Sequence, residues 1–314
     1  MPMHYTSLIR DTLCAKGTAS LTPLPDHFPA AEWPATLLHL LRWRAAHEPA
    51  RAAYGFIADD GSDDTFVTYD ELDRQARAIA AQLQAAGAVG QRALLLYPPG
   101  LDYIAAFFGC VYAGVVAVPV VPPRLNRPMP RLQAVAADSR AEFGLTVASI
   151  YTSLERRFEH EPALAKLKWF STDAVAAGET SGWAEPAVRP DALAFLQYTS
   201  GSTSAPKGVM LSHGNLMHNL EVIRIGFQID ATARSVFWLP AYHDMGFIGG
   251  ILAPMYIGGL STIMSPASFL QRPFRWLDAI SKARALVTGA PNFAYDLCVD
   301  KVAPAERAAL DLSS

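Results

Sequence analysis

Short apolar runs alternate along the chain with segments whose apolar residues recur at helical spacing. The runs predict strands that helices cover on both faces, because continuous apolar sequence suits a buried parallel sheet. Strands are expected at residues 93–97, 115–120, 143–147, 192–198, 236–239, 261–264 and 285–288. Helices are expected near 36–46, 101–113 and 131–139. The pattern therefore predicts an α/β fold of sheets flanked by helices.

A hairpin and a capped helix are expected in the first third of the chain. Residues 52–58 and 65–69 flank a polar run with one glycine, which is typical of a tight turn between two strands. Thr68 and Glu71 have the spacing of a capping box. Apolar residues then follow at helical spacing until Gly87, namely Leu72, Ala76, Ile79 and Leu83.

Three units are expected along the chain. Residues 1–35 are rich in proline and lack periodicity, which predicts an extended N-terminal arm. A polar, proline-bearing stretch at 178–190 interrupts the alternation of helices and strands. We therefore expect a first α/β subdomain at 36–185 and a second α/β subdomain at 186–314.

Two apolar stretches, 103–123 and 245–264, contain no Lys, Arg, Asp or Glu and are long enough to span a membrane. Glycine and proline interrupt both, which instead predicts a buried helix, a glycine stop and a buried strand. The mean hydropathy of +0.15 is low for a multi-spanning protein. Residues 1–20 also lack the apolar core of an export signal. We expect no transmembrane segment.

Charge and cysteine content narrow the function classes. With 26 Lys and Arg against 29 Asp and Glu, the chain has no positive excess to neutralise phosphates, so no nucleic-acid partner is expected. Its three cysteines, Cys14, Cys110 and Cys298, show no C-x-x-C spacing. They predict neither a disulfide framework nor a zinc site, and a cytoplasmic location fits them best.

The most informative segment follows the strand expected at 192–198. Small, hydroxyl-bearing residues at 199–203 leave backbone N–H groups exposed, which favours an anion site, and Lys207 adds a positive charge. The order Lys207–Gly208 differs from a Walker A loop, and no G-x-S-x-G nucleophile elbow surrounds the serines. A flexible linker is the alternative, but the preceding strand favours a phosphate-binding loop.

Residues 198–203 with 206–209 resemble the ATP phosphate loop of the adenylate-forming enzymes, and the chain before them is similar to that family's early framework. The resemblance implies the N-terminal domain of the adenylate-forming fold. It implies that a carboxylate attacks the α-phosphate of ATP, giving an acyl-adenylate and pyrophosphate. It also implies Mg²⁺, with Thr199 or Thr203 supplying a hydroxyl to the metal. The implied ATP phosphate-binding residues are Thr199, Ser200, Gly201, Ser202, Thr203, Lys207 and Gly208.

Residues 237–246 form a second segment of interest. By themselves, Asp244 is interpreted as a helix cap and His243 as an ordinary histidine, because one such pair defines no mechanism. The aromatic residues Trp276, Phe293 and Tyr295 are interpreted in the same way as core.

Residues 243–246, 265–277 and 289–298 resemble the fatty acyl-AMP ligase branch of that family. Members pass an activated fatty acid to an acyl carrier protein, or to a polyketide or nonribosomal synthase, instead of to coenzyme A. The resemblance implies a catalytic gating role for His243. The implied acyl-substrate residues are His243, Asp244, Met245, Trp276, Phe293 and Tyr295. A fatty acyl-CoA synthetase, or a catalytically silent module that binds acyl chains or carrier protein, is the alternative.

Two other groupings do not indicate sites. His213 and His218 are five residues apart and do not share a helix face, so no metal site is expected, and Ser212 is interpreted as an N-cap. The glycine pairs 249–250 and 258–259 lack the G-x-G-x-x-G spacing of a dinucleotide-binding loop.

The resemblance extends over residues 36–314. The Y-G-x-[TA]-E motif, the T-G-D motif and the C-terminal catalytic lysine that the family carries further along do not occur in these residues. We therefore expect the N-terminal portion of a ligase without its C-terminal domain, and we expect this portion alone to be inactive.

Overall fold

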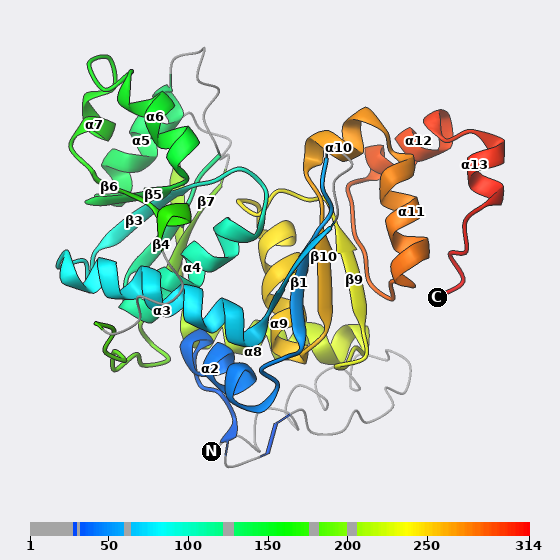
Figure 1. Ribbon diagram of the computed structural model, residues 1–314, viewed down its shortest axis with the longest axis horizontal. Coiled ribbons are helices and arrows are strands. Elements are labelled where there is room, and N and C mark those ends of the chain that lie inside the picture. The colour runs from blue at the N-terminus through cyan, green and yellow to red at the C-terminus, as the bar shows by residue number, and fades with distance from the viewer. Residues whose placement is uncertain (1–27, 30–31, 60–63, 122–128, 176–181, 200–205) are drawn as a thin grey trace.

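Two sheets dominate the computed structural model, which describes residues 28–29, 32–59, 64–121, 129–175, 182–199 and 206–314 (Figure 1). The first has six strands, parallel except for the edge strand β8, in the order β6 (Lys168–Ser171), β5 (Phe143–Thr146), β3 (Arg92–Leu96), β4 (Val116–Pro119), β7 (Leu193–Thr199) and β8 (Lys207–Ser212). The second has four strands, parallel except for the edge strand β2, in the order β2 (Thr65–Thr68), β1 (Ala52–Phe56), β10 (Leu260–Ile263) and β9 (Arg234–Phe237).

Helices form layers between the two sheets and outside each of them (Figure 1). The middle layer holds α2 (Leu37–His47), α3 (Tyr69–Ala85), α4 (Leu101–Ala113), α8 (His213–Phe227), the π-helix η3 (Met245–Leu252) and α9 (Ala253–Ile257). The outer face of the six-stranded sheet carries α5 (Pro130–Ser139), α6 (Ala148–Glu155) and α7 (Pro162–Ala165), and the short η2 (Thr172–Ala174) follows β6. The four-stranded sheet carries α10 (Pro266–Gln271), α11 (Phe274–Ala283) and α12 (Asn292–Lys301), followed by α13 (Pro304–Ala308). The largest hydrophobic core fills the middle layer, so the predicted α/β fold is confirmed.

Helix starts coincide with the caps that the sequence provides. Thr68 Oγ1 accepts a hydrogen bond from the Glu71 backbone N–H at 3.3 Å, and the Glu71 carboxylate accepts one from the Thr68 N–H at 2.8 Å. This confirms the capping box of α3 and the hairpin β1–β2 before it. Ser212 caps α8 in the same way, with Asn215 as its partner.

Both apolar stretches are internal parts of the fold. In the first, α4 ends at Gly114, whose left-handed backbone (φ 68°) turns the chain into β4. In the second, η3 and α9 end at Gly258 (φ 79°), and β10 follows. The predicted order of buried helix, glycine stop and buried strand is confirmed. Among the described residues, no helix is both long and apolar enough to cross a membrane.

The sheets do not divide as 36–185 and 186–314, because each takes strands from both sides of that boundary. Strand β7 pairs with β4 in the six-stranded sheet, and β1 pairs with β10 in the other. The described part of the polar stretch before β7, from residue 182, also contacts the body. The Trp183 ring stacks on Tyr112 at 5.4 Å, and its Nε1 donates a hydrogen bond to the Tyr112 backbone oxygen. Polar composition marked a connection here, but it carried no information on strand pairing.

Three further expectations are met in part. The strand expected at 285–288 forms one isolated bridge, from Val287 to Ser235. The elements β6, β8, α6, α7, η2 and α10–α13 were not predicted. Of the expected N-terminal arm, residues 1–27 and 30–31 lie outside the described residues, while Phe28 is buried against Trp33 and Trp43. Cys110 and Cys298 are free thiols, and Cys14 lies outside the described residues.

Candidate functional site

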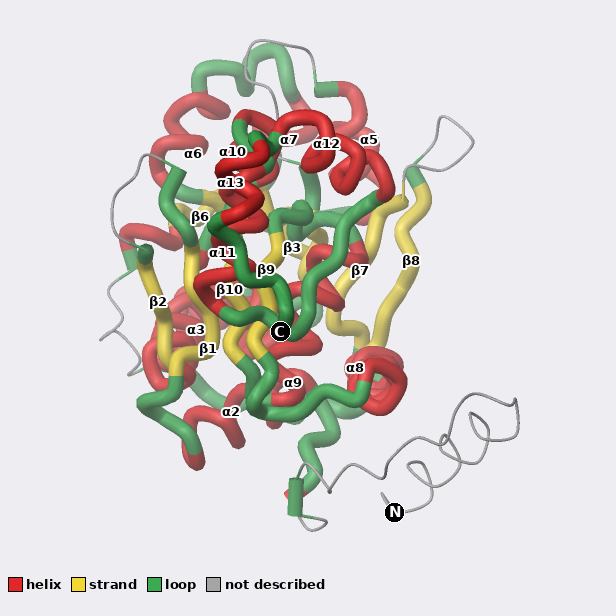
Figure 2. The backbone as a smooth tube through the Cα atoms, turned by 90° about the vertical axis from the view of Figure 1, so that its right-hand side faces the viewer, coloured by secondary structure: helices red, strands yellow, loops and turns green. Residues whose placement is uncertain are grey.

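The segment expected to bind phosphate joins β7 to the antiparallel edge strand β8. Figure 2 shows β7 and β8 side by side, with α8 beginning where β8 ends. Thr199, the last residue of β7, is paired with Lys207, the first residue of β8. Directly opposite residues in an antiparallel pair project to the same face, so the Thr199 hydroxyl and the Lys207 ammonium share one side of the sheet. Ser200, Gly201, Ser202 and Thr203 lie outside the described residues.

Alternation along β7 shows which face this is. Phe195 packs edge-on against Phe247 of η3, with ring centroids 5.2 Å apart. Gln197, two residues later on the same face, donates from Nε2 to the Tyr242 backbone oxygen at 2.8 Å. Thr199 is the next residue on that face, so Thr199 and Lys207 face the turn at 240–244. Lys207 is exposed and forms no salt bridge within the part of the chain that the structure describes.

Packing against Tyr198 explains why residue 208 is a glycine. Gly208 is paired with Tyr198, and a Cβ at residue 208 would lie 2.9 Å from the Tyr198 ring. Tyr198 Oη donates to Asp138 Oδ2 at 2.5 Å, and burial together with this carboxylate raises the pKa of the phenol. The ring belongs to the outer core, on the opposite face from Thr199. A phosphate contact from the Gly208 backbone stays a prediction.

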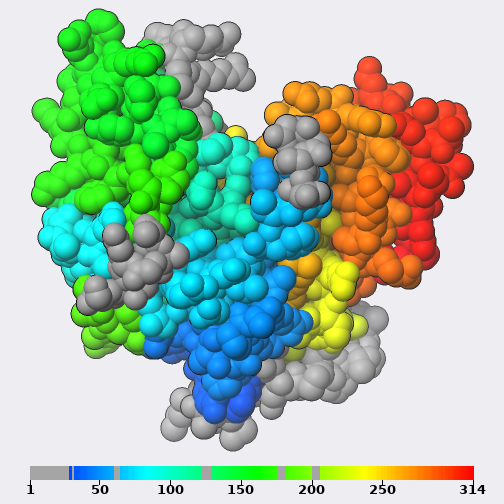
Figure 3. All heavy atoms as spheres, viewed as in Figure 1, coloured from blue at the N-terminus to red at the C-terminus, as the bar shows by residue number. Residues whose placement is uncertain are grey.

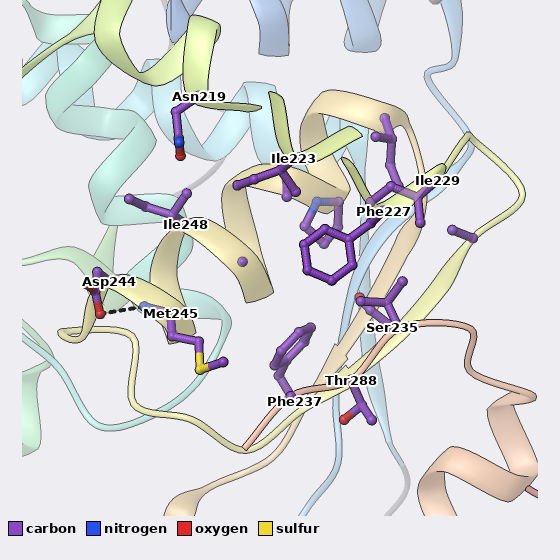
Figure 4. A pocket seen from close by; sticks show the side chains of 17 residues that line it. Asn219, Ile223, Phe227, Ile229, Ser235, Phe237, Asp244, Met245, Ile248 and Thr288 are labelled. Atoms are coloured by element: carbon purple, nitrogen blue, oxygen red, sulfur yellow. Dashed lines mark hydrogen bonds between the residues drawn. The ribbon is translucent and has the colours of Figure 1, made fainter. Parts of the chain in front are cut away.

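The turn that carries His243 is held by backbone and side-chain hydrogen bonds. His243 N–H donates to the Pro240 oxygen at 3.1 Å, and Tyr103 Oη of α4 donates to the Ala241 oxygen at 3.1 Å. The Asp244 carboxylate accepts a hydrogen bond from the Met245 N–H at 2.8 Å, so Asp244 caps η3 as its position suggested (Figure 4). His243 itself is exposed.

An apolar pocket of about 390 Å³ opens beside this turn. Asp244 and Met245 line it at one end, and the side chains of α8, β9, η3 and α9 form its walls (Figure 4). π-Helical turns are rare and frequently occur at functional sites. The lining residues are Asn219, Ile223, Phe227, Ile229, Ala233, Ser235, Phe237, Asp244, Met245, Ile248, Gly249, Ala253, Pro254, Ile257, Val287, Thr288 and Gly289.

The three aromatic residues expected at the acyl site do not line this pocket. Trp276 is 1% exposed and lies in the outer core of the four-stranded sheet, which agrees with its interpretation as core. Its Nε1 donates to Thr288 Oγ1 at 3.0 Å, so it supports one wall residue from behind. Phe293 and Tyr295 lie half-exposed on α12.

Sequence reasoning missed the walls of the pocket. Ile223 and Phe227 of α8 are four residues apart and continue the apolar stripe that carries Leu216 and Leu220 into the core. Phe227 is 68% exposed. Because the spacing of these residues is that of a single core-facing stripe, the sequence contains no signal that separates the pocket walls from the core.

The described residues do not form a metal site on their own. They contain no group of three or more His, Cys, Asp and Glu side chains with suitable spacing. His213 is buried, its Nδ1 accepts a hydrogen bond from the Leu37 N–H at 3.3 Å, and burial lowers its pKa to about 4. His218, five residues further along α8, is exposed. One hydroxyl, that of Thr199, is too little to hold Mg²⁺ without other oxygen ligands.

Figure 3 shows a hollow between the block of α5–α7, in green, and the block of α10 and α11, in orange. The carboxyl ends of parallel strands are where ligands bind in open α/β sheets. The strands β7 and β9 lead at their carboxyl ends to the two motif segments. The site is therefore built between the two sheets, from one strand end of each.

Comparison with known proteins decides the family. The sequence pattern of the family described as AMP-binding enzyme matches residues 41–314. The chain belongs to this family. Within the family, it is 44% identical over 283 residues to the medium-chain-fatty-acid–[acyl-carrier-protein] ligase JamA of Moorena producens, covering 89% of this chain and 48% of that protein. It is 36% identical over 286 residues to the 4-hydroxyphenylalkanoate adenylyltransferase of Mycobacterium tuberculosis, covering 88% and 46%.

Solved structures agree with this membership. The fatty acyl-adenylate ligase from L. pneumophila, in complex with acyl adenylate and pyrophosphate, superposes with a TM-score of 0.83 and 40% identity. That match covers 89% of this chain and 48% of the ligase chain. A phenylalanyl-adenylate complex of McyG shares the fold, with a TM-score of 0.81 at 22% identity. The chain spans about half the length of the curated relatives that it matches.

Proposed function

We propose that the protein containing these residues is a fatty acyl-AMP ligase, which joins a fatty acid to AMP with release of pyrophosphate. The observation that carries the proposal is the placement of the turn at 240–244. On one side it faces Thr199 and Lys207, and on the other it opens onto an apolar pocket. A phosphate-binding group and an acyl pocket on two sides of one turn would bring the acid's carboxylate to the nucleotide.

In the proposed reaction, a carboxylate oxygen attacks the α-phosphorus of ATP, and the bond to the pyrophosphate oxygen breaks with its electron pair. Positioning and electrostatics carry such chemistry. Lys207, residues Thr199–Thr203 and the Gly208 backbone would hold the β- and γ-phosphates. His243, exposed at the turn, would gate the acyl pocket behind Asp244 and Met245. Mg²⁺ would neutralise phosphate charge when bound. The described residues do not complete a site for it. The roles above are therefore assigned to the residues of the chain alone.

The pocket favours an unsubstituted alkyl chain. Its walls are almost entirely apolar, and burial contributes about 0.8 kcal/mol per methylene. We infer an acyl carrier protein as the acceptor and a cytoplasmic location, where ATP is available. The identity to JamA, a protein named for transfer to a carrier protein, supports this acceptor over coenzyme A.

The test uses the full-length protein with ATP, Mg²⁺ and fatty acids. Fatty-acid-dependent ATP–pyrophosphate exchange is expected, and it would be absent from a silent binding module. Adding either a phosphopantetheinylated carrier protein or coenzyme A, and following thioester by mass, separates the acceptors. Efficient acyl-CoA formation would make the protein an acyl-CoA synthetase.

A further inference from the structure

Gln197 connects the two halves of the proposed site. It lies on β7 two residues before Thr199, it is 7% exposed, and its Nε2 donates to the backbone oxygen of Tyr242 at 2.8 Å. The two residues are 45 positions apart in the sequence. One end of this contact leads into the segment expected to bind phosphate, and the other lies next to His243.

The turn at 240–244 accepts two such side-chain hydrogen bonds at consecutive carbonyls. Tyr103 of α4 donates to the Ala241 oxygen, and Gln197 donates to the Tyr242 oxygen. Tyr103 holds the turn to the helical layer, whereas Gln197 holds it to the strand that ends at Thr199. Phe195 and Phe247 form an apolar contact one step earlier on the same face of β7. Gln197 thus provides the polar part of this connection.

A glutamine at this buried position is energetically unfavourable in one respect. Its Oε1 is buried without a hydrogen-bond partner among the described residues, and an unpaired buried acceptor is unfavourable. An apolar side chain of similar length would avoid that penalty and still pack beside Phe195. The residue therefore has to be explained by what its donor does.

We propose that Gln197 is a positioning residue, which sets the His243 turn relative to the phosphate-binding end of β7 through its hydrogen bond to Tyr242. This inference rests on the proposed adenylation and concerns a residue that acts through the turn at 240–244. Misplacing catalytic groups by about 1 Å can lower a rate on the order of a hundredfold. Loss of the donor should therefore lower kcat and leave the KM for the fatty acid nearly unchanged.

The experiment replaces Gln197 in the full-length protein and measures ATP–pyrophosphate exchange with whichever acid the wild type activates. Gln197→Met keeps the length but removes the donor, and kcat should fall about tenfold or more. Gln197→Glu has a donor only when its carboxyl is protonated, and burial raises the pKa of such a group. Its kcat relative to wild type should therefore rise as the pH falls. Tyr103, Tyr242, His243 and Lys207 are present in both proteins, so the ratio removes their contribution.

Gln84→Glu is the matched control. Gln84 Nε2 also donates to a backbone oxygen, that of Ala184 at 2.7 Å, but at an exposed place away from the site. Its exchange activity relative to wild type should not depend on pH. An unchanged kcat in Gln197→Met, or a low but pH-independent ratio in Gln197→Glu, would overturn the inference. If no acid supports exchange by the wild type, the proposed function is overturned, and this inference with it.

Discussion

Replacing Gly249 with leucine is expected to shorten the apolar pocket that we propose holds the acyl chain. Gly249 belongs to η3 and lines the pocket. A Cβ built on it meets no atom within 4 Å, so the direction of its missing side chain is open space. A leucine there projects into the cavity and leaves the backbone of the π-helix in place.

The size of the effect follows from the volume that the side chain takes. Leucine brings four carbon atoms into a cavity of about 390 Å³, so it displaces roughly four methylene groups of a chain that fills the pocket. At about 0.8 kcal/mol per methylene, the loss is about 3 kcal/mol, or roughly 200-fold in kcat/KM. Acids too short to reach Gly249 should lose little.

The assay compares kcat/KM for ATP–pyrophosphate exchange across saturated acids of increasing length. Gly226→Leu is the matched control, because Gly226 lies on α8, a Cβ there also meets nothing within 4 Å, and it does not line the pocket. The same loss at every chain length in Gly249→Leu, or no loss for the longest acids, would refute the assignment of this cavity to the acyl chain.

Two further predictions concern a charge and a buried histidine. Lys207→Ala should lower kcat/KM for ATP about ten- to hundredfold, because a charge-assisted hydrogen bond contributes roughly 1.5–3 kcal/mol, while fatty-acid affinity measured by calorimetry should stay unchanged. Burial, and to a smaller extent the charge of His39, lowers the pKa of His213 from 6.5 to about 4 in the folded protein. As the pH falls, the unfolded chain therefore binds a proton at this histidine before the folded protein does. Stability from this group is complete above pH 6.5 and falls by roughly 3 kcal/mol as the pH drops toward 4. Urea unfolding should show a weaker dependence on acid pH in His213→Asn than in wild type, and equal dependences would contradict this reasoning.

The parts of the fold that the sequence predicts well are those fixed by interactions between residues close together in the sequence. The capping box of Thr68 and Glu71 is complete within four residues, so its signal is readable without any tertiary contact. The same holds for the glycine that ends α4, because Gly114 adopts the left-handed backbone that its residue type favours. Periodicity also located the buried strands β3 and β4 to within about a residue.

The pairing of the strands and the residues that line the pocket cannot be predicted from local sequence patterns. Tyr54 pairs with Ser261 across more than two hundred residues, and no local pattern in either strand indicates the other. The segment that we propose binds phosphate was identified from its own residues, whereas the pocket takes Phe227 from the end of one helix and Val287 from an irregular segment. The aromatic residues Phe293 and Tyr295 were assigned to the acyl site by resemblance, but the apolar walls beside Asp244 come from other elements.

The three glycines of η3 differ in how much space the structure leaves for a side chain. At Gly246 a Cβ would lie 2.3 Å from the Pro240 oxygen, so alanine must displace the turn that carries His243. At Gly250 it would lie 3.2 Å from the Phe237 ring, which can move slightly into the pocket, and at Gly249 it meets nothing. Exchange activity of the three alanine variants should therefore rank Gly249→Ala first, Gly250→Ala second and Gly246→Ala last. A Gly246→Ala enzyme as active as Gly249→Ala would show that the reaction does not depend on how closely the π-helix approaches this turn.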